Sequence, residues 1–380
     1  MSFPSQGARH WEESPMIRTS VFPRRYVQGA GALHQLGPEL KRLGSKVFAL
    51  VDHFVADQIT PYLDGLTDVS VVSHLFTGHC THPIIENIAA IAKKSDATVL
   101  VAFGGGSVLD VGRSAASAAG MAFVSAPTIA ASDAPCSGIS IVYDENGVMS
   151  GRLTLRNPDL VIVDTALIAK APVRFFAAGI GDGLATWYEA DSCRRSHSGT
   201  ISGVTGTALA HAAARLCRDT ILERGRQAVN DCRAHLATPD LDAVVEATVL
   251  LSGIGFESGG LGAAHAIHNG LTMLPQTARY MHGEKVAFGL LASLFLSERA
   301  EEERRALFAF CRDVGLPVRL SQIACDAGDD EALTTVAAKA CQPGSNIHNE
   351  PFPVTPDMVV TALKAADLFG AHYSAASPSE

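Results

Sequence analysis

The chain has 380 residues, of which 47% are apolar and 18% are charged. This composition is typical of a folded protein, and the length predicts two domains. The 30 basic and 39 acidic residues give a net charge of −9, which disfavours nucleic acid and anionic membranes as partners.

Short β-branched runs alternate with helical patterns through the first part of the chain. The pattern predicts strands over residues 46–52, 69–75, 97–106 and 121–128, and helices over residues 84–94 and 107–120. Such alternation is typical of a parallel sheet that is covered by helices on both faces. Residues 137–155 carry Glu-Asn-Gly between two extended runs, which predicts a β-hairpin.

After a further apolar run at residues 159–164, the hydrophobic pattern no longer alternates between strands and helices. From about residue 167 to residue 370 the pattern is almost entirely helical, with abundant alanine and with breaks at glycine or proline. We therefore predict an N-terminal α/β domain of residues 1–166 and a helical domain of residues 167–380.

Three consecutive glycines, Gly104, Gly105 and Gly106, stand between a predicted strand and a predicted helix. Glycine lets a ligand approach the backbone closely, and a helix N-terminus offers free N–H groups to phosphate. The run does not match the Gly-x-Gly-x-x-Gly fingerprint, so a tight turn without a ligand explains it equally well.

Two aspartates follow predicted strands. Asp52 ends the strand at residues 46–52, where a carboxylate can bind the ribose hydroxyls of an adenine nucleotide or cap the helix that follows. Asp133 lies in a loop of small hydroxyl residues after the strand at residues 121–128. There it either forms a turn or faces a substrate.

Asp182 is a candidate metal ligand in the helical part. It shares one face of a predicted helix with Thr186 and Glu189, and its glycine neighbours leave access to its carboxylate. The alternative is a solvent-exposed carboxylate near a helix start, where the helix dipole stabilises negative charge.

Three histidines complete the candidate metal site. His265 and His268 are three residues apart and face one side of a helix, while His282 opens another helix, whose dipole favours neutral imidazole. One carboxylate and two neutral imidazoles suit Zn²⁺, with a position left open for substrate or water. For His268 we expect a hydrogen-bonded or core position rather than direct ligation.

The cysteines and the apolar runs predict where the protein resides. None of the eight cysteines forms a Cys-x-x-Cys pair, which indicates scattered reduced thiols. Residues 1–20 lack the apolar segment of a secretory signal, and no run of about 18 apolar residues occurs. We therefore expect a cytoplasmic protein that does not enter a membrane.

Several long motifs resemble those of the glycerol dehydrogenases, in the iron-containing (metal-dependent) alcohol dehydrogenase superfamily. They are APTIAASDAPCSG (126–138), NPDLVIVDTALIAKAPVRFFAAGIGDGLATWYEA (157–190), GFESGGLGAAHAIHNGLT (255–272) and HGEKVAFG (282–289). The resemblance extends over roughly residues 16–373. It implies a dehydroquinate synthase-like fold, with a Rossmann-like NAD-binding domain, a helical metal-binding domain and a cleft between them.

The resemblance also implies NAD and one divalent metal per subunit, usually zinc, with Asp182, His265 and His282 as ligands. Iron-type relatives have a fourth ligand, a histidine, at the position of Thr186, so this chain matches the three-ligand zinc type. The resemblance places the pyrophosphate on Gly104, Gly105, Gly106, Ser107 and Val108, and the nicotinamide beside Thr128, Ser137, Ile139 and Tyr143. Asp52 and Asp110 are further expected contacts of the nucleotide.

The resemblance also implies that Asp133 contacts the polyol. For the released proton we expect transfer either to water or to His268. Relatives tend to carry lysine where this chain has Ser107 and Arg113, and the segment around His79 also departs from the family pattern.

The implied reaction is the NAD-dependent oxidation of glycerol at its secondary hydroxyl to dihydroxyacetone, with hydride leaving a metal-bound alkoxide. The alternative is the same chemistry on another small vicinal diol, such as 1,2-propanediol, or on a hydroxy acid.

Two other classes of protein are less consistent with these residues. A related lyase would need a dense set of phosphate-binding side chains, and only Arg279 and Lys285 lie near the histidines. A non-catalytic binding protein would not need the Asp–His–His set. Family likeness also implies a homo-oligomer, with an octamer as one form.

Overall fold

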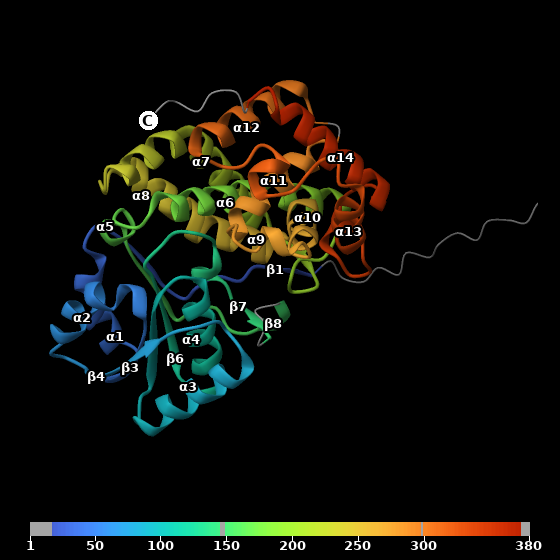
Figure 1. Cartoon of the computed structure of the whole chain (residues 1–380). Helices are drawn as coiled ribbons and strands as arrows, with labels where there is room; N and C mark the ends of the chain where they lie inside the picture. Colours follow the sequence, from blue (N-terminus) through green and yellow to red (C-terminus); the bar gives the residue numbers. More distant parts are fainter. Residues whose placement is uncertain (1–16, 145–148, 298, 374–380) are drawn as a thin grey trace, which may run out of the picture.

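The computed structural model describes residues 17–144, 149–297 and 299–373. Most of the N-terminal segment considered for a secretory signal lies outside these residues, as does the Glu-Asn-Gly turn at residues 145–147. The described chain forms an α/β part and a helical part, which lie against each other (Figure 1). This architecture confirms the predicted fold class.

A six-stranded parallel sheet forms the centre of the α/β part. Its strands, in spatial order, are β2 (Tyr26–Gly29), β9 (Leu160–Asp164), β6 (Ala122–Pro127), β5 (Val99–Gly104), β3 (Lys46–Asp52) and β4 (Ser70–Phe76). The chain runs from β3 to the edge strand β4, then returns past β3 to β5 and continues to β6 and β9, so crossover helices lie on both faces. β3, β5 and β9 are almost fully buried, as continuous apolar runs predict for the inner strands of a parallel sheet.

Helices cover both faces of this sheet. They are α1 (Leu36–Lys41), α2 (Ala56–Asp64), α3 (His82–Lys94) and α4 (Gly106–Ala119). The first two pack with Val47, Val99 and their neighbours on one face, and the other two pack with Phe48 and Leu100 on the opposite face. The alternation of side chains along each strand therefore builds two separate apolar cores.

The hairpin predicted over residues 137–155 is present. β7 (Ile139–Tyr143) pairs antiparallel with β8 (Met149–Thr154) as a separate two-stranded sheet. It follows a short 3₁₀ turn, η3 (Ala134–Cys136), in the loop after β6.

The helical part packs around a third apolar core. Its helices are α5 (Thr165–Ile168), α6 (Val173–Ser196), α7 (Ala208–Arg233), α8 (Pro239–Glu246), α9 (Ser252–Gly259), α10 (Ala263–Leu271), α11 (His282–Ser293), α12 (Glu301–Val314), α13 (Asp330–Ala340) and α14 (Pro356–Gly370). A π-helical turn, η4 (Ala247–Leu251), joins α8 to α9. Val161 and Val163 of β9 belong to the same core, so the sheet and the helices share an apolar contact.

One short strand interrupts the helical part. β10 (Thr205–Gly206) pairs in parallel with β1 (Arg18–Thr19) at the start of the described chain. Residues 18–19 are thus attached to the helical part, although they precede the α/β part in sequence.

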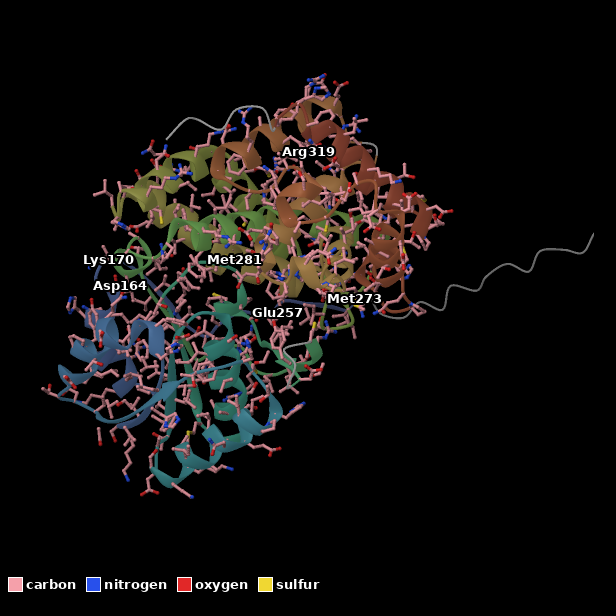
Figure 2. The ribbon with its side chains drawn as sticks, viewed as in Figure 1. Asp164, Lys170, Glu257, Met273, Met281 and Arg319 are labelled. Carbon is pink, nitrogen blue, oxygen red and sulfur yellow. The ribbon has the colours of Figure 1, made fainter. Side chains whose placement is uncertain are left out.

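Polar side chains also lie where the two parts meet. Glu257 lies between them in Figure 2 and accepts hydrogen bonds from the Gly138 N–H (3.0 Å) and the Asn157 amide (2.6 Å). Asp164 accepts from the N–H groups of Gly31 and Leu33, which fastens the chain after β2 to the end of β9.

No single helix among the described residues is long and apolar enough to cross a bilayer. The segment from α8 through α9 (Pro239–Gly259) and the helix α10 reach that length and hydropathy only when taken together, and the chain bends by 99° between them.

Candidate active site

Asp182, His265 and His282 converge in the helical part. Each offers one ligand atom, and these atoms lie within 4.8 Å of one another. The Nε2 atoms of His265 and His282 lie 3.4 Å and 3.2 Å from Oδ1 of Asp182. Residues from three different helices, up to 100 positions apart in sequence, therefore face one common point.

Glycines allow the helices that carry these residues to cross closely. A Cβ atom on Gly283 would lie 1.8 Å from the carbonyl oxygen of Ala178, and one on Gly181 would lie 2.6 Å from the carbonyl oxygen of Gly283. The backbones of α6 and α11 are thus in direct contact beside Asp182 and His282. Any larger residue at these positions would separate the two ligands.

Asp182 is not the exposed carboxylate that the alternative interpretation described. It lies well inside α6 and is 1% exposed. Burial alone would raise the pKa of this carboxyl, but His282 and His265 outweigh burial and hold its pKa well below the usual range. Although both ring nitrogens are near, Oδ1 has no partner with hydrogen-bonding geometry in the described structure. A buried oxygen in this situation is suited to a cation.

Glu189 fixes the orientation of His265. Its Oε2 lies 2.6 Å from Nδ1 of His265, and its Oε1 accepts from the backbone N–H groups of Gly262 (2.8 Å) and His265 (2.9 Å). Burial lowers the pKa of His265, but the charges of Glu189 and Asp182 raise it well above its usual range. Because Nδ1 donates to Glu189, Nε2 is the atom that faces Asp182.

A chain of hydrogen bonds defines the tautomers of the other two histidines. Nδ1 of His268 lies 3.1 Å from Oδ1 of Asn269, which only accepts, so Nδ1 carries the proton. Burial and the neighbouring His282 lower the pKa of His268, so its ring is neutral and its Nε2 accepts from Nδ1 of His282 at 3.0 Å. This contact turns Nε2 of His282 toward Asp182. His268 contacts a candidate ligand rather than the common point itself.

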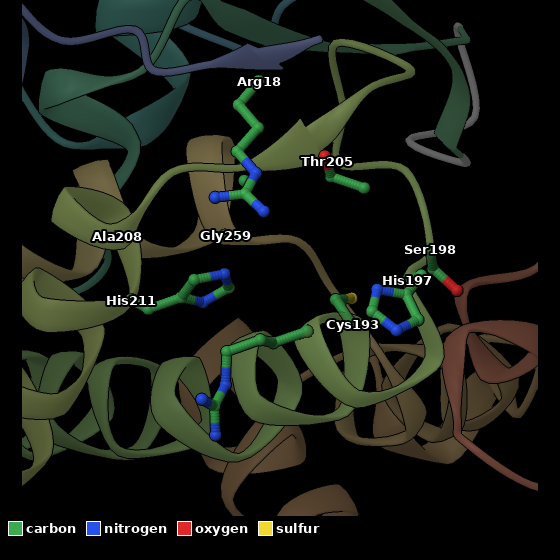
Figure 3. A pocket seen from close by; sticks show the side chains of 10 residues that line it. Arg18, Cys193, His197, Ser198, Thr205, Ala208, His211 and Gly259 are labelled. Carbon is green, nitrogen blue, oxygen red and sulfur yellow. The ribbon is translucent and has the colours of Figure 1, made fainter. Parts of the chain in front are cut away.

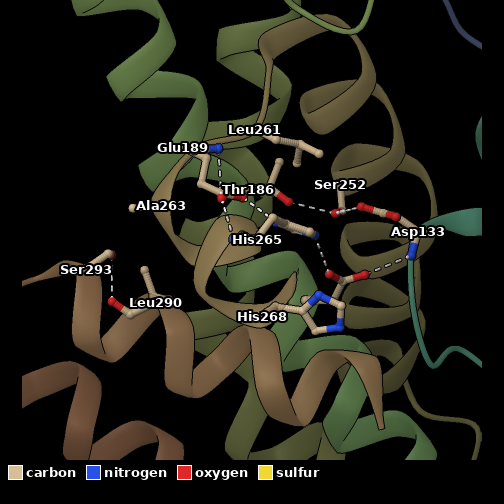
Figure 4. A network of polar contacts seen from close by, with 12 residues as sticks. Asp133, Thr186, Glu189, Ser252, Leu261, Ala263, His265, His268, Leu290 and Ser293 are labelled. Atoms are coloured by element: carbon tan, nitrogen blue, oxygen red, sulfur yellow. Dashed lines mark hydrogen bonds and ion pairs between the residues drawn. The ribbon is translucent and has the colours of Figure 1, made fainter. Parts of the chain in front are cut away.

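Asp133 reaches the same region from the loop after β6. Its N–H donates to Oδ2 of Asp182 (3.4 Å), and its own carboxylate accepts from Ser252 (2.7 Å) at the start of α9. The hydroxyl of Ser252 is also 2.8 Å from that of Thr186, which lies one helical turn after Asp182 (Figure 4). Burial first, and then the charge of Asp182, raise the pKa of Asp133 well above its usual range. The carboxylate of Asp133 is therefore held beside the ligand set.

The glycine run lies at the junction of β5 and α4, as predicted. Gly104 has φ +147°, and a Cβ there would lie 2.5 Å from Val108 and 2.7 Å from the Cβ of Asp52, so packing alone requires this glycine. A Cβ on Gly105 would meet Ile129 at 2.9 Å, whereas one on Gly106 would meet nothing within 4 Å. The backbone at the start of α4 is therefore open to a ligand.

Asp52 does cap the turn that follows it, since its side chain accepts from the N–H of Phe54 at 3.0 Å. It also lies beside Gly104, at the carboxyl edge of the sheet where nucleotides bind in such folds. Thr128 is at the same edge, with its N–H donating to the Gly104 carbonyl (3.1 Å). Ser107 and Val108 lie in the first turn of α4.

Asp110 and Arg113 fasten α4 to the hairpin. Oδ1 of Asp110 accepts from Arg113 (2.8 Å) and Oδ2 accepts from the N–H of Ile141 (3.1 Å). Arg113, 1% exposed, also donates to the carbonyls of Ile139 and Ala134. The contacts of Asp110 are thus to the protein, and its predicted contact with the nucleotide stays a prediction.

The remaining predicted nucleotide contacts, Ser137, Ile139 and Tyr143, lie on this fastened segment. Ser137 follows η3, and the other two belong to β7. The Arg113 contacts therefore position the segment relative to the start of α4.

Sequence reasoning missed several residues of this site. Glu189 carried a signal, because it lies on the helix face of Asp182, but its role as the partner of His265 was not predicted. Ser252 and Arg113 carried none that pattern reasoning detects, since their partners are distant in sequence. Arg113 was noted only as a departure from the family pattern.

The chain is similar to one described protein family and to several named proteins. The model of the iron-containing alcohol dehydrogenase family matches residues 23–165. Glycerol dehydrogenase of Thermotoga maritima is 47% identical over 93% of this chain and 98% of its own length. Glycolaldehyde reductase of Halobacterium salinarum is 41% identical, covering 93% of this chain and 98% of its own length.

A solved structure shows the same fold. The crystal structure of a probable glycerol dehydrogenase from Sinorhizobium meliloti superposes with a TM-score of 0.88 at 39% identity, over 94% of this chain and 100% of the other. Relatives this similar extend over nearly the whole chain and not only over its α/β part. The chain is therefore an oxidoreductase that belongs to the iron-containing alcohol dehydrogenase family, among relatives named glycerol dehydrogenase.

Proposed function

We propose that this enzyme oxidises glycerol at the secondary hydroxyl to dihydroxyacetone, with NAD and one divalent metal ion, preferably Zn²⁺. The convergence of Asp182, His265 and His282 within 4.8 Å carries the proposal. The substrate is supported by the relatives named glycerol dehydrogenase.

The three residues fit a catalytic metal ion. They offer one ionised carboxylate oxygen and two imidazole nitrogens, the donor set that Zn²⁺ prefers, and Oδ1 of Asp182 is buried without a hydrogen-bond partner in the described structure. Three protein ligands leave one position open. The side chain of His282 is 42% exposed, so the ligand set borders solvent on the His282 side.

When bound, the metal ion supplies Lewis acidity toward a hydroxyl oxygen, and NAD supplies the hydride acceptor. The protein provides the orientation. Glu189 and His268 hold the two imidazoles, so that both Nε2 atoms point at the shared position. Ser252 holds Asp133 where its carboxylate can accept a hydrogen bond from a second hydroxyl of the substrate.

Recognition of that second hydroxyl favours polyols over simple alcohols, because a buried acceptor left without a donor is unfavourable. His268 is neutral and 8% exposed, and its Nε2 faces Nδ1 of His282 at 3.0 Å, so a proton released at the site would reach His268 through His282.

The nucleotide would bind along the start of α4. The open backbone at Gly106 and the N-terminus of a 14-residue helix suit its pyrophosphate. Asp52, at the end of the neighbouring strand, is placed for a ribose hydroxyl.

The test is NAD-linked turnover of glycerol before and after chelation. We expect activity to be lost from the metal-stripped enzyme and restored by Zn²⁺, and the Asp182→Asn variant to retain neither metal nor activity. Unchanged turnover of glycerol after elemental analysis has confirmed that metal is absent contradicts the proposal.

A second candidate is the same chemistry on another small hydroxyl or hydroxyaldehyde substrate. The Halobacterium salinarum relative, named glycolaldehyde reductase, is 41% identical, nearly as similar as relatives that carry the glycerol name. Comparing kcat/KM for glycerol, 1,2-propanediol, a hydroxy acid and glycolaldehyde separates these substrates. A tenfold or larger preference for one of the other three over glycerol would favour this second candidate.

A further inference from the structure

A cavity of about 340 Å³ opens on the surface of the helical part, away from the metal ligands. It lies between the β1–β10 pair, the end of α6 and the start of α7 (Figure 3). Its size is within the range of small-molecule sites. None of its lining residues, all within the described chain, is acidic, whereas the lining includes Arg18, Arg194, His197 and His211. This local excess of basic groups contrasts with the net charge of −9 of the whole chain.

Arg18, an exposed residue, contributes a guanidinium group to this cavity. Its guanidinium points into the space between His211 and His197 (Figure 3). Within the described residues it makes no hydrogen bond and no ion pair, whereas Arg194 uses its NH2 group on Asp191 at 2.9 Å. A planar fork of N–H donors without a partner is suited to an oxyanion.

His211 provides a second unused donor. Neither of its ring nitrogens is hydrogen-bonded within the described structure, and only Nδ1 is fully buried, so Nε2 is accessible. Burial and the nearby Arg194 lower the pKa of His211, so the ring is neutral in the empty cavity and has one N–H group that can donate to an anion. Ala208, the first residue of the 26-residue helix α7, also lines the cavity, so the positive end of that helix adds to the field.

The cavity is separate from the proposed active site. Cys193, which lines it, is eleven residues after Asp182 on α6, a distance of roughly 16 Å along a helix. Gly259, which also lines the cavity, ends α9 six residues before His265.

We propose that this cavity binds the phosphate group of a small metabolite, with Arg18 and His211 as its principal donors. A phosphate oxygen matches the fork of Arg18, and the volume exceeds that of the phosphate group alone, which leaves room for a short organic substituent. The site does not depend on the glycerol chemistry.

The probes are inorganic phosphate and methyl phosphate, titrated calorimetrically into the metal-loaded enzyme. We expect both to bind, and the dissociation constant to rise about tenfold or more in Arg18→Gln and in His211→Gln. Arg195→Gln, which removes the same charge from the adjacent end of α6 outside this cavity, is the matched control and should change binding less than twofold.

A site-specific readout separates this cavity from the nucleotide site, which also attracts phosphate. Phosphate should slow the modification of His211 by diethyl pyrocarbonate, measured by peptide mass spectrometry, but not that of the exposed His372. Turnover of glycerol by the two variants should equal that of the native enzyme, because neither residue belongs to the proposed active site.

Three results would overturn the inference. They are phosphate binding that is equal in native enzyme and Arg18→Gln, modification of His211 that phosphate does not slow, and succinate binding as tightly as methyl phosphate. The last result would assign the cavity to dicarboxylates instead. Far-ultraviolet circular dichroism and the melting temperature of each variant establish that a loss of binding is not a loss of folding.

Discussion

The hydroxyl of Ser252 links the substrate side of the site to the metal side. It donates to Asp133 and contacts Thr186, one turn after Asp182 on α6. Ser252→Ala leaves the buried carboxylate of Asp133 without this donor, so its position and ionisation are no longer defined. We expect kcat/KM for glycerol to fall about tenfold, mainly through KM, with metal content unchanged.

Thr248→Val is the control for that change. Thr248 is an equally buried hydroxyl one turn earlier, but it donates to the carbonyls of Val244 and Val245 rather than to Asp133. If Thr248→Val lowered kcat/KM for glycerol as much as Ser252→Ala does, the loss would come from disturbed packing and not from Asp133.

Glu189 gives the metal site a defined dependence on pH. In the metal-free protein the pKa of His265 is raised, because Glu189 and Asp182 outweigh burial, so at neutral pH a proton occupies the position that a metal ion would take. Metal binding must displace that proton. We therefore expect the affinity for Zn²⁺ to increase about tenfold per pH unit from pH 6 until His265 deprotonates.

The Glu189→Gln variant tests whether the carboxylate of Glu189 causes this dependence of zinc affinity on pH. Without the carboxylate charge the pKa of His265 falls, so the rise in affinity should end at a lower pH. The plateau affinity should also fall, by about 10–100-fold, as orientation of the imidazole weakens. A native affinity that is flat between pH 6 and 8 would show that His265 is already deprotonated.

At the scale of elements, glycines determine how far α6 and α11 are apart. A Cβ on Gly283 would lie 1.8 Å from the Ala178 carbonyl. Gly283→Ala must therefore separate the helices and move His282 away from Asp182. We expect a loss of about 1–3 kcal/mol of unfolding free energy together with a weaker affinity for zinc.

Gly151→Ala, in β8, is the matched substitution, because a Cβ there meets nothing within 4 Å. Melting curves and metal titrations of both variants compare the two positions. Should Gly283→Ala bind zinc as tightly as the native chain, the close crossing would not be what positions the ligands.

The sequence predicts most of these elements for clear physical reasons. The apolar run at residues 46–52 matches β3, and the helical period at residues 84–94 lies within α3, which Thr81 caps. The two-residue strands β1 and β10 were not predicted, since two residues carry no periodicity. The role of Ser252 was not predicted either, because its partner is 119 residues away and only the folded chain brings them together.

Across the whole molecule, the three candidate ligands all belong to the helical part, while Asp133 and the glycine run belong to the α/β part. Removing the metal should therefore loosen the first turns of α10 and α11 and leave the sheet unchanged. Zinc at 100 times its dissociation constant should stabilise the fold by about 2.7 kcal/mol.

Hydrogen–deuterium exchange with and without zinc measures this pattern. We expect faster exchange near His265 and His282 in the metal-free protein, with β3, β5 and β6 unaffected. Uniform acceleration through the sheet would mean that metal stabilises the two parts as one cooperative unit.

The pairing of β1 with β10 means that the backbone passes between the two lobes twice, once before β2 and once after β9. Both crossings stay intact in any relative movement of the lobes, so the chain itself limits how far they can separate. Val161 and Val163 of β9, which belong to the apolar core of the helical lobe, lie beside the second crossing, so packing as well as chain connectivity holds the junction there.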